Sequence, residues 1–548
     1  MVQTGNESGK TGGDLLVEGL ERWSIDQLFG VPGVQLDQLF DAIQRKPDAP
    51  RVYHCRHEQG AAYMAFGYAM ATGKPGVCAI VPGPGVLNGG AALATAWACN
   101  ARVLCLTSTI NSAFHGRGLG ALHEIEDQTG LLRGLTKWTA RARHASEIPG
   151  LVDEAFRQLL SGRPRPVALE IPPDILAQRT NAAYPAALPS ITKPAVDPSM
   201  IDKAAELCLA AKKPMIIVGS GAMDAGDEVR ALAEELQAPI VTRNMGRGVV
   251  PAEDPYHLPG AAANGMWADT DCVIGIGTRL QQLREWGHDP SLRIVRIDLD
   301  YSETNKIALA DAAIIADASD GARALADAIA TQNPQRESRL EEIAAVRGQF
   351  ENAIKEELAP QIAYLDALRS EMADDDVLVD EMTQVAYVGR YAFPVKAPRS
   401  FVHSSFQGTL GYGFATALGA QVGAGDRQVI SINGDGGFMY TMPELATAML
   451  HDIHLIAIVF TDGHFGNVKR IQASAYGGRH IACELHNPDF VALAQSFGMA
   501  ALRAEGPEGL RMALREAKQV KGPVLIECPV HDEEFPSPWK HIHGRKVR

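Results

Sequence analysis

The sequence lacks the features that mark several large classes of protein. It has no block of basic residues: the formal net charge is -14, and charged side chains are spread along the whole chain. Nucleic acids and anionic membranes both require a basic patch, so we expect neither as a partner. A signal peptide and an apolar run of about 18 residues are also missing, which predicts a cytoplasmic protein.

The eight cysteines show no regular spacing and no Cys-x-x-Cys pair. Most lie in apolar runs, so buried free thiols in a reducing compartment are favoured over disulfides. The opening "GNESGKT" resembles a phosphate-binding loop, but it has three residues between the glycines instead of four and no preceding strand. We therefore expect residues 1–12 to be a disordered tail.

The body of the chain repeats one pattern, a short apolar strand, a glycine-rich turn and a helix rich in Ala, Leu and Glu. This alternation predicts an α/β fold with doubly wound parallel sheets. The pattern forms three blocks, at 13–185, 198–335 and 355–548. A linker rich in Pro and Ala, "NAAYPAALPSITKPAVDPS", separates the first two, and a charged helical connector leads to the third. Each block has the size of a normal domain.

Two acidic residues stand at the ends of two apolar strands in the third block. The strand "QVISING" runs into Asp435, and the strand Leu455–Phe460 runs into Asp462. Ligands of open parallel sheets bind beyond the carboxyl ends of the strands, and glycine-rich turns before helices favour phosphate. Carboxylates would repel a phosphate unless a hard cation lay between them, which predicts Mg²⁺ or Ca²⁺ under a diphosphate. The alternative is a helix cap at Asp435 and an ordinary turn residue at Asp462.

The segment "GDGGFMYTMPELATAMLHDIHLIAIVFTDGHFG" resembles the thiamine diphosphate signature. "CRHEQGAAYMAFGYAMATGKPGV", "PGPGVLNGGAALATAWACNARVLCLT" and "FQGTLGYGFATALGA" are similar to further segments of the acetolactate synthase, pyruvate oxidase and benzaldehyde lyase group. The resemblance implies a pyrimidine-binding domain, a central Rossmann-like domain and a diphosphate-binding domain. It also implies a homodimer or homotetramer whose active sites lie between subunits.

The resemblance assigns a metal site and a set of cofactor contacts in the third block. Asp435, Asp462 and the backbone carbonyl of His464 are expected to bind Mg²⁺. Thr461-Asp462 replaces the usual Asn-Asn pair of the family but keeps an oxygen ligand. The other expected contacts with thiamine diphosphate in this block are Thr383, Gln384, Gly408, Leu410, Gly434, Gly436, Gly437, Phe465, Gly466 and Asn467.

The resemblance also implies catalytic roles. Glu58, in "RHEQGAA", matches the glutamate that bonds the aminopyrimidine ring, where it favours the tautomer whose 4′-nitrogen acts as an internal base. Leu410 matches the apolar wedge between the two cofactor rings, and the Gly408 carbonyl would accept from the 4′-amino group. The alternatives are a surface glutamate and an ordinary core leucine.

Gln35 and His123 are the remaining catalytic candidates, because their loops face the substrate in this family. His115, Arg117 and Gln128 lie in the same stretch as His123, "AFHGRGLGALHEIEDQ". For each of these residues the alternative is a solvated position on a loop.

The expected activity is that of a lyase or carboligase, a decarboxylase or transferase acting on 2-oxo acids or related acyloins and 1,2-diketones. A 1,2-diketone-cleaving hydrolase of the cyclohexane-1,2-dione hydrolase branch, a 2-hydroxyacyl-CoA lyase or oxalyl-CoA decarboxylase-like enzyme, and an inactive scaffold stay open. Some members of the group bind FAD through the central domain. Here the corresponding segment 257–287 is shortened and lacks the Gly-Met-His-Gly type of turn, which argues against FAD.

Overall fold

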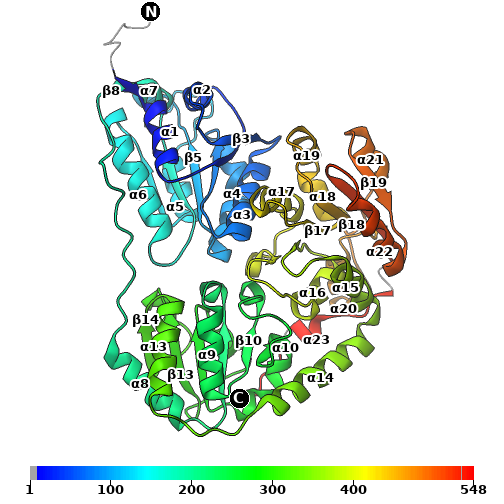
Figure 1. The fold of residues 1–548 in the computed structure, drawn as a ribbon. Helices are drawn as coiled ribbons and strands as arrows, with labels where there is room; N and C mark the ends of the chain where they lie inside the picture. The colour runs from blue at the N-terminus through cyan, green and yellow to red at the C-terminus, as the bar shows by residue number, and fades with distance from the viewer. Residues whose placement is uncertain (1–8, 532–533, 543) are drawn as a thin grey trace, which may run out of the picture.

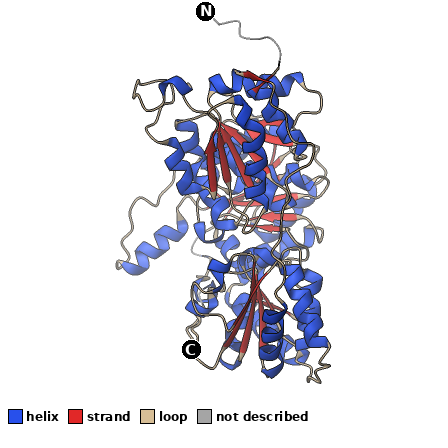
Figure 2. Ribbon diagram, turned by 90° about the vertical axis from the view of Figure 1, so that its left-hand side faces the viewer, coloured by secondary structure: helices blue, strands red, loops and turns tan. Residues whose placement is uncertain are grey.

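The computed structural model describes residues 9–531, 534–542 and 544–548. Within this part of the chain, three six-stranded sheets follow one another along the sequence, and every strand pair in them is parallel. Helices cover both faces of the sheets (Figure 2). The predicted fold class, three doubly wound parallel-sheet domains, is confirmed.

The N-terminal sheet has the strand order β3-β2-β4-β5-β7-β6. Its strands are β2 (Gln27–Gly30), β3 (Arg51–His54), β4 (Gly76–Ile80), β5 (Val103–Thr107), β6 (Trp138–Arg141) and β7 (Val167–Glu170). Its helices are α1 (Gly12–Arg22), α2 (Asp37–Arg45), α3 (Glu58–Thr72), α4 (Pro84–Cys99), α5 (Gln128–Leu135), α6 (Ile148–Leu160) and α7 (Pro173–Ala177). One face packs against α1, α2 and α6, and the other against α3, α4 and α5.

The central sheet has the order β11-β10-β9-β12-β13-β14. Its strands are β9 (Pro214–Val218), β10 (Ile240–Thr242), β11 (His257–Pro259), β12 (Cys272–Ile276), β13 (Arg293–Asp298) and β14 (Ala312–Ile315). Its helices are α8 (Pro198–Ala210), α9 (Gly226–Leu236), α10 (Gly260–Ala263), α11 (Gln282–Glu285), α12 (Tyr301–Thr304) and α13 (Ala318–Ala330). An extended linker joins it to the N-terminal domain, and α14 (Leu340–Glu357) leads on to the C-terminal domain (Figure 1).

The C-terminal sheet has the order β16-β15-β17-β18-β20-β19. Its strands are β15 (Val377–Val379), β16 (Phe401–Val402), β17 (Val429–Gly434), β18 (Ile456–Thr461), β19 (Ala500–Arg503) and β20 (Val524–Pro529). Its helices are α15 (Ala359–Glu371), α16 (Gln384–Ala392), α17 (Gly413–Ala424), α18 (Asp435–Thr441), α19 (Leu445–Leu450), α20 (Gly466–Ala475), α21 (Phe490–Ser496), α22 (Gly506–Ala517) and α23 (Trp539–Ile542).

One structural feature departs from the expected disordered tail of residues 1–12. Residues 1–8 lie outside the described residues. Lys10–Thr11, however, forms β1 and pairs antiparallel with β8 (Arg179–Thr180). The Thr11 hydroxyl oxygen accepts from the Asp14 N–H and the Asp14 carboxylate accepts from the Thr11 N–H, which caps α1. The prediction of disorder is therefore wrong for residues 10–12.

The N-terminal and C-terminal domains share one hydrophobic core where α3 crosses α17. Glycines bring the two helix backbones together. A Cβ atom at Gly67 would lie 1.9 Å from the carbonyl oxygen of Thr416, and one at Gly419 would lie 1.9 Å from the carbonyl oxygen of Met64. This crossing fixes the position of α3, which begins with Glu58, relative to the C-terminal domain.

Among the described residues, no helix combines the length and the apolar character that crossing a membrane requires.

Candidate active site

The two strand-end carboxylates of the C-terminal domain lie at the same turn. Strands β17 and β18 are direct neighbours, with Gly434 opposite Phe460, so the residues that follow them meet at one edge of the sheet. The Oδ2 atom of Asp435 accepts from the backbone N–H of Gly463 at 2.8 Å and of Asp462 at 3.2 Å. The prediction that Asp435 and Asp462 lie close together in space is therefore correct.

Asp435 is buried, and burial raises its pKa above the ordinary value while four N–H donors act in the opposite direction. Besides Asp462 and Gly463, the donors are the Gly436 N–H at 2.7 Å and the Asn487 side-chain amide at 2.7 Å. Asn487 was not predicted, because it lies 52 residues further along the chain in an irregular segment with no motif. That segment also holds the turn that contains Asp462 and Gly463, since the Leu485 N–H donates to the Gly463 carbonyl at 2.8 Å.

A cavity of about 50 Å³ opens at this edge of the sheet. It is lined by Met382, Thr383, Gln384, Val385, Tyr387, Gly434, Asp435, Phe460, Asp462, His464, Gly466, Asn467, Val530 and Phe535. Eight of the predicted cofactor and metal residues thus face one space. Gly436 lies in the first turn of α18 against the Phe465 ring, where an added Cβ would stand 2.7 Å from that ring.

The cavity combines negative side chains with positive helix ends. Helix α16 begins at Gln384 and α20 begins at Gly466, and both residues line the cavity. Helix N-termini favour anions, whereas the Asp435 and Asp462 carboxylates favour a cation. The buried Oε1 atom of Gln384 has no hydrogen-bond partner in the described part of the chain. The residues therefore fit a phosphate group together with a divalent cation.

The protein supplies few side-chain ligands for that cation. Among the described residues, no group of three or more His, Cys, Asp or Glu side chains is arranged to hold a metal. The His464 imidazole contacts the Asp462 carbonyl at 2.8 Å through Nδ1 and the Lys469 amine at 3.2 Å through Nε2. The oxygen atoms of the Asp435 and Asp462 carboxylates are donors of the kind that Mg²⁺ accepts.

Glu381 is a buried carboxyl beside this cavity that sequence reasoning missed. Its side chain accepts from the backbone N–H of Gly411 at 2.5 Å and of Gly413 at 3.3 Å, so it holds the loop that contains Leu410. Burial raises the pKa of Glu381 to about 8. A Cβ at Gly437 would lie 1.9 Å from the Glu381 Oε1 atom, which explains the second glycine after Asp435. The signal was present, because Asp380 and Glu381 directly follow strand β15, and Asp435 likewise follows β17.

Leu410 is half-buried and Gly408 is exposed on the loop between β16 and α17. Gly408 has φ +56° and Gly411 has φ +80°, so the loop uses glycine where the backbone is left-handed. A Cβ at Gly411 would lie 2.3 Å from the Cβ of Tyr440, which belongs to α18. The loop and α18 are therefore packed together.

Glu58 is the first residue of α3 and is half-buried. Its Oε2 atom accepts from the Asn88 side-chain amide at 3.0 Å. Its Oε1 atom faces the first turn of α4, where a Cβ at Gly85 would lie 3.1 Å away. Asn88 was not predicted, although it lies three residues after the "PGPG" turn in a segment that the resemblance covers.

Gln35 and His123 are brought together at the same end of the N-terminal sheet. Gln35 donates from Nε2 to the Leu122 carbonyl at 3.1 Å, and its Oε1 atom lies 3.2 Å from Nδ1 of His123. His123 has φ +66°, a strained conformation that is common at functional sites. A Cβ at Gly83 would lie 2.4 Å from the His123 carbonyl oxygen, so this loop packs against the turn that begins α4.

The other residues of the predicted substrate loop, Gln128, His115 and Arg117, differ from one another in burial and in contacts. Gln128 is buried, and its amide group accepts from the Gly83 N–H at 2.7 Å and donates to the Ser108 carbonyl at 2.8 Å and to Glu170 at 2.7 Å. Its role is to hold the turn before α4. His115 contacts the Thr109 hydroxyl at 2.9 Å, and Arg117 is exposed.

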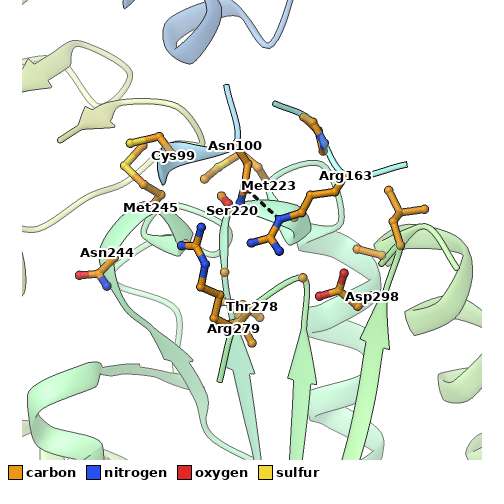
Figure 3. Close-up of a pocket in the computed structure, with 18 of the residues that line it drawn as sticks. Cys99, Asn100, Arg163, Ser220, Met223, Asn244, Met245, Thr278, Arg279 and Asp298 are labelled. Carbon is orange, nitrogen blue, oxygen red and sulfur yellow. Dashed lines mark hydrogen bonds between the residues drawn. The ribbon is translucent and has the colours of Figure 1, made fainter. Parts of the chain in front are cut away.

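A larger cavity of about 250 Å³ lies where the central domain meets the other two. Figure 3 shows Arg163 and Arg279 directing their guanidinium groups into it, with Arg163 donating to Asn100 at 2.9 Å. Glycines 219, 221 and 277 form its floor at the carboxyl ends of central strands. Arg279 lies over the Phe406 ring at 4.5 Å, and burial lowers its pKa to about 10. None of the predicted catalytic or metal residues lines this cavity within the described ranges.

Family models match all three domains. The N-terminal thiamine pyrophosphate binding domain matches residues 10–131, the central domain of thiamine pyrophosphate enzymes matches 201–325, and the C-terminal binding domain matches 382–528.

Curated relatives match over nearly the full length. A probable 2-ketoarginine decarboxylase of Pseudomonas aeruginosa is 34% identical over 94% of this chain and 93% of its own. A probable acetolactate synthase large subunit of Methanocaldococcus jannaschii is 32% identical over 95% of this chain and 92% of its own. The acetolactate synthase large subunit of Corynebacterium glutamicum is 30% identical over 95% of this chain and 87% of its own.

Proposed function

The chain belongs to the thiamine pyrophosphate enzyme family, and on this premise we propose that it is a thiamine-diphosphate- and Mg²⁺-dependent decarboxylase and carboligase of 2-oxo acids. The observation that carries the proposal is the small cavity at the edge of the C-terminal sheet. There two carboxylates and two helix N-termini face one space, as a cation and a diphosphate together require.

In this proposal the C-terminal domain binds the charged end of the cofactor. Asp435, Asp462 and the His464 carbonyl hold Mg²⁺. Thr383 and Gln384, at the start of α16, would turn a helix N-terminus toward the diphosphate, and the unsatisfied Gln384 Oε1 atom stays available as an acceptor for a water or an N–H donor. When bound, thiamine diphosphate supplies a thiazolium carbon that attacks the carbonyl of the substrate.

Glu58 exchanges a proton with the pyrimidine ring in this scheme. Asn88 holds its Oε2 atom, which fixes the plane of the carboxyl group and leaves Oε1 for the ring nitrogen. The loop that carries Leu410 and Gly408 contacts the pyrimidine side of the cofactor, and Glu381 holds that loop through two backbone N–H groups.

His123 and Gln35 serve the substrate. Because the Gln35 Nε2 atom donates to the Leu122 carbonyl, its Oε1 atom is the acceptor toward His123. The proton of a neutral His123 therefore lies on Nδ1, and Nε2 is the acceptor. His123 Nε2 then takes or returns a proton at the reacting carbonyl.

A second copy of the chain completes the site. Every residue that lines the small cavity comes from the segment 382–535, whereas Glu58, Gln35 and His123 belong to the N-terminal domain. Apolar side chains are exposed beside both halves: Leu87, Leu122, Met439, Tyr440, Val468, Ile471 and Ile481. Exposed apolar groups of this kind mark interaction surfaces. We therefore propose a homodimer, or a tetramer built from it, with each active site between subunits.

A cytoplasmic location is part of the proposal. All eight cysteines are free and buried, which is typical of proteins in a reducing compartment. The sequence argues against FAD, and this stays a prediction: the purified protein is expected to show no flavin absorbance.

The decisive experiment adds thiamine diphosphate and Mg²⁺ to the apoprotein and measures melting temperature and turnover. The substrate panel contains pyruvate, 2-ketoarginine, benzoylformate and a cyclic 1,2-dione, and product analysis separates decarboxylation, ligation and hydrolysis. Glu58→Gln should lose most turnover but still bind the cofactor through its diphosphate, and Asp435→Ala should lose the cofactor. Asp376→Asn is the control, because that buried carboxylate also holds two backbone N–H groups but lies outside the cavity.

An unchanged melting temperature and no turnover on the panel would favour the inactive scaffold. Turnover of the dione alone would favour the diketone hydrolase.

A further inference from the structure

A buried carboxyl of the C-terminal domain reaches the backbone just before Glu58. Glu444 ends the 3₁₀ helix Met442–Glu444, directly after α18, and its side chain has no exposed surface. Its Oε2 atom accepts from the Arg56 N–H at 3.1 Å, and its Oε1 atom accepts from the His57 N–H at 3.1 Å. The Thr447 hydroxyl also donates to it. Two domains that are 387 residues apart at this point in the sequence are thus joined by one side chain.

The first turn of helix α3 has space for this carboxyl group because Gly60 has no side chain. A Cβ at Gly60, in the first turn of α3, would lie 2.1 Å from the Glu444 Oε1 atom, so only glycine leaves room for it. His57 is the N-cap of α3 and accepts from the Gln59 N–H through Nδ1 at 3.2 Å. Glu444 supplies the acceptor for the His57 and Arg56 N–H groups at the N-terminus of a 15-residue helix.

The carboxyl is costly to bury at this place. Its partners are N–H and O–H groups, and burial raises the pKa of Glu444 above its ordinary value. A buried acidic group is stable only where hydrogen bonds compensate its desolvation, so its geometry is tightly determined by the groups that it bonds. The two peptide groups that it bonds immediately precede Glu58.

We propose that Glu444 is a positioning residue for Glu58: it fixes the backbone at the start of α3 and so sets where the Glu58 carboxyl stands. The inference rests on the proposed role of Glu58 at the pyrimidine ring. Glu444 does not itself touch the cofactor in this scheme. It follows α18, which begins with Asp435, so a short helical segment ties the turn at Asp435 to the backbone that precedes Glu58 in the same chain.

The test measures how well the full-length apoprotein with Mg²⁺ distinguishes two ligands by calorimetry. One ligand is thiamine diphosphate, and the other is its analogue with CH in place of the ring N1′, which cannot exchange a proton with a carboxyl group. The wild-type protein should prefer the native cofactor by roughly ten- to a hundredfold, the range of a charge-assisted hydrogen bond. Glu58→Gln should remove most of this preference.

Glu444→Gln and Gly60→Ala should each reduce the preference several-fold while binding of the analogue stays close to that of the wild type. The first removes one acceptor from the Arg56–His57 pair, and the second displaces the carboxyl from the other domain. Asp271→Asn is the matched control, because Asp271 accepts from the successive N–H groups of Lys212 and Lys213 at 2.7 and 2.9 Å in the central domain. It should lose stability without changing the preference.

Two results would overturn the inference while leaving the proposed function intact. The first is that Glu444→Gln and Gly60→Ala both prefer the native cofactor over the analogue as strongly as the wild-type protein does. The other is an equal loss of affinity for both ligands, which would indicate general damage. If Glu444→Gln does not fold, Gly60→Ala and Glu444→Asp decide in the same way. A wild-type preference in Glu58→Gln would instead refute the proposed role of Glu58, and the positioning role with it.

Discussion

The crossing of α3 and α17 gives the sharpest stability prediction. Gly67→Ala places a methyl group 1.9 Å from the Thr416 carbonyl oxygen, whereas real Cβ atoms do not approach within about 3 Å. The obstacle is backbone, so no side-chain rotation relieves it. The two helices must separate by about 1 Å, the difference between these two distances.

We expect Gly67→Ala to destabilise the chain by about 2 kcal/mol. Overpacking of a buried site costs about 1–3 kcal/mol, and a gap of about 1 Å along the rest of the contact loses further dispersion energy. The better helix propensity of alanine offsets at most about 1 kcal/mol of this. The matched control is Gly348→Ala in α14, where a Cβ meets nothing within 4 Å. It should stabilise by about 0.5–1 kcal/mol.

Thermal unfolding followed by circular dichroism checks the pair. Since 1 kcal/mol corresponds to roughly 2–4 °C in a domain of this size, Gly67→Ala should melt about 4–8 °C below the wild type. Gly348→Ala should melt slightly above it. The reasoning is refuted if Gly67→Ala melts at or above the wild-type temperature, because the helices would then have room that the structure denies.

Two further predictions concern the cofactor side of the C-terminal domain. Burial raises the Glu381 pKa to about 8, from about 4.3 in an unfolded chain, so the folded state keeps this proton at pH values where the unfolded chain has lost it. The stability that the protonated Glu381 contributes to the folded state is therefore lost as the pH rises through 8. The melting temperature of the wild type minus that of Glu381→Gln should therefore fall from pH 6 to pH 9; a constant difference would contradict it. Thr383→Ala removes the side-chain acceptor for the Ala386 N–H that caps α16, at 2.9 Å, and should cost about 1 kcal/mol, while Thr383→Ser should stay near wild type in urea unfolding. Equal stability of the two Thr383 variants would show that the cap does not matter.

Local patterns in the sequence were sufficient for the architecture. Strands buried on both faces have to be continuous apolar runs, and their alternation with helices permits only parallel sheets, so three such domains could be predicted. Asp435 and Asp462 could be predicted as a pair for the same reason, because residues that follow neighbouring parallel strands share one edge. The tail was predicted less well, since β1 exists only through its pairing with Arg179–Thr180, far along the chain.

The sequence by itself determined the element order, the sheet type and which residues follow the strand ends, because these depend on periodicity and on short-range turn chemistry. Only the tertiary structure decided which polar groups hold these residues. Asn487 on Asp435, Asn88 on Glu58 and Glu444 on the backbone before Glu58 are contacts between segments 30 to 388 residues apart. No local pattern encodes such contacts, because they arise only when packing brings separate elements within hydrogen-bond distance.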